Sequence, residues 1–164
     1  MICRMFLGCV ESLSRASLLL VCLTLAACSG DQLSAEDRVR ALIDAMEQSV
    51  EAGSVREAIS FLHADYTDPR HTGRQAASRT LFGITQRHRG IHLFTLTKTV
   101  EFTPQQDSAT AVVFVAMTGI PVESVEALIS VKADLYRFEL ALVEEEGEWR
   151  ILSSRWQRVD PRDL

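Results

Sequence analysis

The spacing of apolar residues changes once along the chain, at Gly90, and no other feature of the sequence constrains the fold as much. Before Gly90, apolar residues recur at helical spacing, first as Val39, Leu42, Ile43, Met46 and Val50. After Gly90, apolar and polar residues alternate, which is typical of strands with one buried face. Helices followed by strands predict an α+β domain, with the N-terminal helices packed on a curved antiparallel sheet.

Capping boxes predict where the helices begin. Each box pairs a serine or threonine with an acidic residue or glutamine three positions later. The pairs are Ser34 with Asp37, Ser54 with Glu57, and Thr72 with Gln75. The first helix should end near Ala52, before Gly53, and the third at Gly90. The second should bury Ala58, Ile59 and Leu62, and the third Ala77, Leu81 and Ile84.

The predicted strands cover 92–102, 109–118, 131–144 and 149–158. In the first of them, His92, Phe94, Leu96, Val100 and Phe102 are expected on one face. In the third, Tyr136, Phe138, Leu140 and Leu142 share a face. Two segments stay open: 119–130 is either a loop or a short helix across 122–128, and 65–69 is extended or turning because Pro69 disfavours helix before it.

The first 27 residues have the pattern of an export signal. Arg4 and Arg15 precede an apolar run of about a dozen residues, shorter than the roughly 20 that a membrane span needs. The run ends in Leu25-Ala-Ala-Cys28, which resembles the lipobox of bacterial lipoproteins. We therefore expect 1–27 to be a signal peptide, 28–34 a lipidated cysteine with a short tether, 35–159 the folded domain and 160–164 a tail.

The lipobox resemblance also implies a location. Cys28 would carry acyl chains that anchor the protein in the bacterial envelope, and several chains anchor stably where one is marginal. Ser29 stands where inner-membrane lipoproteins of enteric-type bacteria usually carry aspartate. By that resemblance the outer membrane is favoured, with the domain facing the periplasm.

Charge and cysteine placement exclude several functions. The net charge is −5 at pH 7, which argues against a nucleic-acid binder. All four cysteines lie at or before Cys28, so the folded domain has no disulfide, thiolate metal site or cysteine nucleophile. The four histidines lack metal-ligand spacing except for His88 and His92, which straddle Gly90. The sequence predicts neither a metal nor a cofactor.

Three segments resemble the nuclear transport factor 2-like superfamily, which includes ketosteroid isomerases and scytalone dehydratases. They are Phe61-Leu-His-Ala-Asp-Tyr-Thr-Asp-Pro69, the helix after Gly73, and Glu148-Trp-Arg-Ile151 leading into Trp156. The resemblance covers 35–159. It implies a cystatin-like cone of helices and sheet with a pocket at its open end, and it supports architecture more than activity.

Isomerase or dehydratase chemistry in such a cone needs a base in an apolar cavity and a donor for the developing oxyanion. The candidate bases are Asp65, Asp68 and Asp134, and the candidate donors are Tyr66 and Tyr136. The alternative for Asp68 is a turn in which its carboxylate caps backbone amides beside Pro69. The tyrosine–aspartate pair of the isomerases does not map onto matching positions in this chain.

Four further residues are candidates for lining a pocket: Lys98, Arg137, Glu139 and Trp156. Polar side chains inside a cone would contact a ligand. Alternatively, a bulge turns Lys98 outward, Arg137 and Glu139 lie on an exposed or dimeric sheet face, and Trp156 fills the core. The basic segment 70–92 either faces anionic headgroups or is a solvated helix face.

Together these features predict an envelope lipoprotein whose non-catalytic domain binds a small molecule or an envelope protein. One alternative is an isomerase- or lyase-type enzyme acting on a small apolar substrate. Another is a structural subunit of an envelope complex or a homodimer. A cavity that holds Asp68 or Asp134 beside a tyrosine would favour the enzyme, and a filled cone with an exposed apolar sheet face would favour the structural role.

Overall fold

The computed structural model describes residues 33–88, 90–131 and 133–160. Its first helix, α2 (Ala35–Glu51), begins with the predicted capping box. The Asp37 amide donates to the Ser34 hydroxyl at 3.1 Å, and the Ser34 amide donates to the Asp37 carboxylate at 3.3 Å. The helix ends just before Gly53, whose φ of 69° suits a residue without a Cβ.

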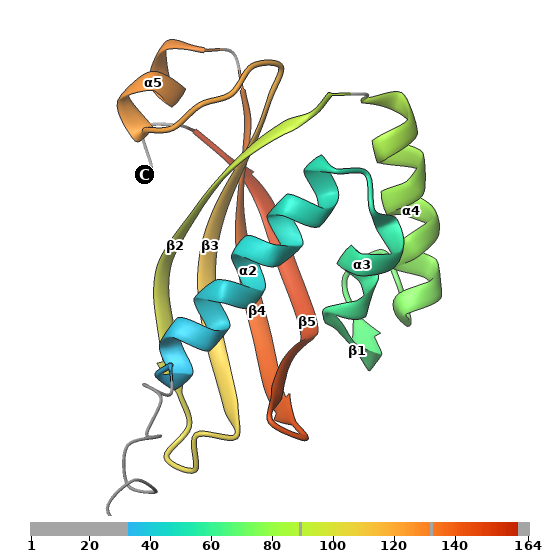
Figure 1. The fold of residues 1–164 in the computed structure, drawn as a ribbon, viewed down its shortest axis with the longest axis vertical. Helices are drawn as coiled ribbons and strands as arrows, with labels where there is room; N and C mark the ends of the chain where they lie inside the picture. Colours follow the sequence, from blue (N-terminus) through green and yellow to red (C-terminus); the bar gives the residue numbers. More distant parts are fainter. Residues whose placement is uncertain (1–32, 89, 132, 161–164) are drawn as a thin grey trace, which may run out of the picture. The chain divides into compact units, whose positions relative to one another are not determined.

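Among the described residues, five strands form one curved sheet (Figure 1). They are β1 (Leu62–Thr67), β2 (His92–Phe102), β3 (Ser108–Thr118), β4 (Asp134–Glu145) and β5 (Glu148–Val159). Their order is β1-β5-β4-β3-β2, with β1 parallel to β5 and the other pairs antiparallel. α2 crosses the concave face, and α3 (Val55–Ser60) and α4 (Arg74–Arg87) lie near the β1 edge. The predicted α+β architecture is confirmed.

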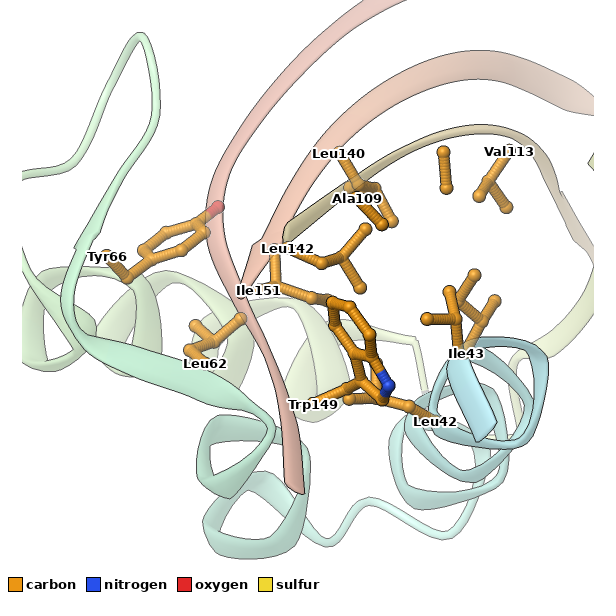
Figure 2. Close-up of a cluster of buried hydrophobic side chains, with 12 residues drawn as sticks. Leu42, Ile43, Leu62, Tyr66, Ala109, Val113, Leu140, Leu142, Trp149 and Ile151 are labelled. Carbon is orange, nitrogen blue, oxygen red and sulfur yellow. The ribbon is translucent and has the colours of Figure 1, made fainter. Parts of the chain in front are cut away.

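The larger apolar core lies between α2 and the concave face (Figure 2). Leu42 and Ile43 of the helix meet Leu140 and Leu142 of β4, which share a face as the alternation predicted. Trp149 is also buried here, and its ring meets that of Phe102 edge to face at 5.6 Å between centroids. Its indole Nε1 has no hydrogen-bond partner among the described residues.

A smaller apolar cluster lies on the opposite, convex face. Phe114, Ala116 and Leu135 of the sheet pack with Leu128 of α5 (Val125–Ser130). β3 therefore buries side chains on both faces, as its continuous apolar run predicted. The segment left open between loop and helix is a turn followed by α5, which Ser124 caps by accepting the Ala127 amide at 3.2 Å.

β2 departs from the predicted pattern. Its pairing with β3 shifts register between Thr97 and Thr99, so Lys98 sits in a bulge and the alternation changes sides there. Apolar residues before the bulge, such as Phe94, pack with the smaller cluster, and those after it, such as Val100, pack with the larger core. The single apolar face predicted for this strand is wrong, because the inserted residue reverses the faces.

Two predicted helix starts are also wrong in detail. Ser54 is the N-cap of α3 but makes no side-chain cap, and α4 begins after Gly73 with no side-chain cap. Leu62, expected on the second helix, begins β1, and the predicted buried side of α4 is only half-buried. β1 was not predicted as a strand because its backbone partners lie on β5, far along the chain.

Residues Ser34–Leu164 form a compact unit by themselves, and both apolar clusters lie within it. We therefore expect this unit to fold on its own. The predicted signal peptide and Cys28 lie outside the described residues. None of the helices in the described ranges is long and apolar enough to cross a membrane.

Candidate functional site

A cavity of about 200 Å³ lies in the larger core between α2 and the concave face, partly open to solvent. Figure 2 shows Val113 and Leu140 on the sheet, across from Ile43 on the helix. The apolar lining residues are Ile43, Met46, Val50, Leu62, Leu93, Val113, Val115, Phe138, Leu140 and Ile151. The polar ones are Glu47, Tyr66, Thr95 and Ser154. Apolar walls with a few polar groups are typical of small-molecule sites.

Tyr66 and Ser154 form a buried polar contact in this lining. The parallel pairing of β1 with β5 brings them together, with the Tyr66 hydroxyl 2.7 Å from Ser154 Oγ. The same hydroxyl donates to Asp68 Oδ2 at 2.9 Å. Because a hydroxyl has one proton and an ionised carboxylate only accepts, Ser154 donates to Tyr66 and Tyr66 donates to Asp68.

Asp68 is the centre of a wider hydrogen-bond network. Its side chain is 5% exposed and accepts the Arg70 amide at 2.7 Å, the His71 amide at 2.9 Å and His71 Nδ1 at 2.8 Å. The other ring nitrogen of His71 lies 2.8 Å from Thr80 Oγ1 on α4. Burial acts to raise the pKa of Asp68, but the hydrogen bonds, with that from His71 the largest, outweigh it and lower the pKa. Asp68 is therefore ionised at neutral pH and joins β1 to α4.

Tyr66 is a poor acid in this environment. Burial is the main cause that raises the pKa of its hydroxyl to about 12, and the hydrogen bond and negative charge of Asp68 act in the same direction. The hydrogen bond from Ser154 opposes the shift. Tyr66 thus keeps its proton, which is directed at Asp68 rather than at the cavity.

Glu47 supplies the only carboxylate among the described residues that line the cavity. Burial is the main cause that raises the pKa of Glu47, and the charges of Glu51 and Asp44 add to the rise, while the hydrogen bond from Thr95 opposes it. Glu47 is therefore an ionisable group held in a partly desolvated position.

The structure brings together only part of the predicted catalytic set. Tyr66 and Asp68 are adjacent, but Asp68 is not among the cavity-lining residues, and its contacts include the backbone caps expected beside Pro69. Asp65 is exposed, and Asp134 forms an ion pair with Arg158 at the surface. Tyr136 packs against the Trp156 ring instead of joining the pair.

None of the four predicted pocket residues lines this cavity. Lys98 is exposed in the β2 bulge, as its alternative held. Arg137 pairs with Glu139 on the convex face, because both residues alternate along β4 with Leu140, which lies on the concave face. Trp156 packs against Phe138, and the Arg70 guanidinium lies 4.3 Å from the Trp156 ring centroid. These placements correct the predicted lining.

Sequence reasoning missed the polar lining residues Glu47, Thr95 and Ser154. Glu47 follows Ile43 by four positions, so it lies on the buried stripe of α2, and a charge at that position was a readable signal. Thr95 and Ser154 had no such signal. Both face the cavity because a register irregularity lies nearby in β2 or β5.

No group of three or more metal-ligating side chains occurs within 33–88, 90–131 and 133–160.

In the predicted basic segment, Arg74 donates to the Leu62 carbonyl at 3.3 Å, so this arginine of α4 is bonded to the start of β1. The other α4 arginines, Arg79 and Arg87, are exposed.

No family model matches the sequence, and no curated protein matches it either. Solved structures do. A putative scytalone dehydratase from Novosphingobium aromaticivorans has a TM-score of 0.63 at 14% identity, covering 76% of this chain and 84% of that one. A cystatin-like domain of unknown function from Nostoc punctiforme has a TM-score of 0.61 at 14% identity, covering 79% and 80%. An uncharacterised cystatin-like protein from Caulobacter vibrioides has 0.60 at 19%, covering 79% and 93%.

At these identities the likeness shows the fold alone. The described domain has a cystatin-like α+β fold, which is the fold that the sequence resemblance implied. This class of fold hosts many unrelated activities, so the function has to be argued from the cavity.

Proposed function

We propose that the domain binds a small, mainly apolar molecule in the cavity between α2 and the sheet. The observation that carries the proposal is the cavity itself, about 200 Å³ of space inside the main core. Close-packed protein interiors hold few voids larger than a water molecule, so a hollow of this size that is partly open to solvent leaves room for a ligand. An apolar cavity of about 150 Å³ holds a benzene molecule in another protein, so this one suits a single ring with a short chain.

The binding test uses 2-phenylethanol as a neutral probe and a substitution that fills the cavity. Val115 lines the cavity from β3, so Val115→Phe should place a ring in the open space and weaken binding at least tenfold. Thr110→Phe adds the same ring at an exposed position of the same strand and serves as the matched control. Isothermal titration calorimetry of Ser34–Leu164 should show binding to the wild type and the control. The proposal would be contradicted if the wild type did not bind 2-phenylethanol, or if Val115→Phe bound it as tightly as the wild type does.

We also propose that the binding domain is carried on an envelope lipoprotein anchored through Cys28. The lipobox-like Leu25-Ala-Ala-Cys28 supports this, together with the short stretch of sequence between Cys28 and the start of α2 at Ala35. In bacteria grown with an alkyne fatty acid, the full-length chain should become labelled and Cys28→Ala should not. Cys22→Ala, within the apolar run, is the matched control and should label normally. Labelling that persists in Cys28→Ala would refute the anchor.

A second candidate function is proton transfer on the bound molecule, and Glu47 is the observation that favours it. A carboxylate in an apolar cavity with a raised pKa is the usual state of a general base. The likeness to the putative scytalone dehydratase is consistent with such chemistry. Deuterium exchange at the carbon beside the carbonyl of phenylacetone, accelerated by the wild type and not by Glu47→Gln, would favour the enzyme over simple binding.

A further inference from the structure

The hydroxyl protons of Tyr66 and Ser154 in the cavity lining are already engaged by protein acceptors. Ser154 donates to Tyr66, and Tyr66 donates to the ionised Asp68. Thr95 also lines the cavity, and a hydrogen bond from its hydroxyl acts to lower the pKa of Glu47 against the larger effect of burial. What these groups still offer to a ligand is therefore lone pairs. The described lining residues include no lysine, arginine or histidine that could donate instead.

The negative charge around Glu47 also favours a ligand that donates hydrogen bonds. Asp44, Glu47 and Glu51 lie on the last turns of α2, where the helix dipole is already negative, and the last turn has no basic residue. The Leu93 amide donates to Glu51 at 2.8 Å, and His92 Nδ1 lies 3.8 Å from the same carboxylate. Among the described residues, only the hydrogen bond from Thr95 acts to lower the pKa of Glu47. Acidic residues at a helix C-terminus oppose helix stability, and such local conflicts are expected at functional sites.

From these two observations we propose that the cavity selects molecules whose polar end donates hydrogen bonds, above all a primary amine on a small apolar body, and rejects carboxylates. This inference rests on the proposed binding function and names the chemical class of its ligand. An ammonium group beside Glu47 would complete an ion pair in a partly desolvated site, where the attraction exceeds that in water. A carboxylate would instead meet the Glu47 charge and lone pairs, with no donor to satisfy it.

The test compares three probes with the same ring and a similar short chain: 2-phenylethylamine, 2-phenylethanol and phenylacetate. Calorimetry of Ser34–Leu164 at pH 7 should give the tightest binding for the amine and at least tenfold weaker binding for phenylacetate. Glu47→Gln should lower the affinity for the amine about tenfold and that for the alcohol far less, because the amide oxygen of glutamine still accepts a hydrogen bond from a hydroxyl but carries no charge to pair with an ammonium group. Glu126→Gln, an exposed glutamate on α5, is the matched control and should change neither.

The outcomes separate this inference from the binding function. If none of the three probes binds, the proposed function fails. If the alcohol binds but phenylacetate binds as well as the amine, binding stands and the ligand class is wrong. If Glu47→Gln prefers the amine over phenylacetate as strongly as the wild type does, the preference does not come from Glu47 and the inference is overturned.

Discussion

Replacing Leu142 with alanine should lower the free energy of unfolding by about 3–5 kcal/mol. Leu142 is 1% exposed, packs in the main core and is not among the cavity-lining residues. Its truncation therefore opens a new void and removes packing contacts on every side. Urea denaturation of Ser34–Leu164, followed by circular dichroism, measures the change.

Leu140→Ala is the matched control for this effect. Leu140 lies two residues earlier on the same face of β4, but it borders the existing cavity. One side of its side chain already faces open space, so fewer contacts are lost and the cost should be smaller by about 1–2 kcal/mol. An equal cost for both substitutions would indicate that the cavity is filled by packed side chains in solution.

Asp68→Ala should lower the free energy of unfolding by about 3 kcal/mol, because it leaves the buried Tyr66 hydroxyl and the part-buried His71 donors without their acceptor. The Tyr66 hydroxyl, the His71 ring and two backbone amides all donate to this carboxylate. Asp65→Ala removes an exposed carboxylate three residues earlier, on β1, and should cost less than about 0.5 kcal/mol. Denaturation of both variants at pH 7 tests the role of the network.

The pH dependence of the Asp68 effect has a definite sign. The pKa of Asp68 is lower in the folded protein than its usual value of about 3.9. Its ionisation therefore stabilises the fold fully above that value, and the contribution is lost as the pH falls through the lower, folded-state pKa. The difference in stability between wild type and Asp68→Ala should shrink below about pH 4. A difference that grows with acid would mean that Asp68 is not held as a carboxylate.

The fold was predictable from the sequence where local pattern decides it. The helical stripe from Val39 to Val50 and the alternation around Leu140 each describe one buried face, and both faces are found as predicted. β1 was not predictable as a strand, since its hydrogen bonds come from β5 and not from its own pattern. The bulge at Lys98 was foreseen only as an alternative, because nothing local distinguishes an inserted residue from one in register.

The site was predictable to a smaller extent. Tyr66 and Asp68 are next-but-one neighbours in sequence, and the structure brings their side chains together. The contact of Tyr66 with Ser154 depends on strand pairing across 88 residues, which no local pattern shows. The four predicted pocket residues do not line the cavity for the same reason. The whole sheet, and not the local pattern, decides which face of each strand becomes concave.

The most direct test of the account is a nuclear magnetic resonance titration of Ser34–Leu164 with 2-phenylethylamine, following assigned methyl groups. Binding in the cavity should move the methyl signals of Ile43, Val113 and Leu140 with the bound fraction, because these residues line the cavity. The signals of Leu128 and Leu135, in the cluster on the convex face, should stay in place. Shifts confined to the convex-face cluster, or no shifts at millimolar probe, would contradict binding in the cavity.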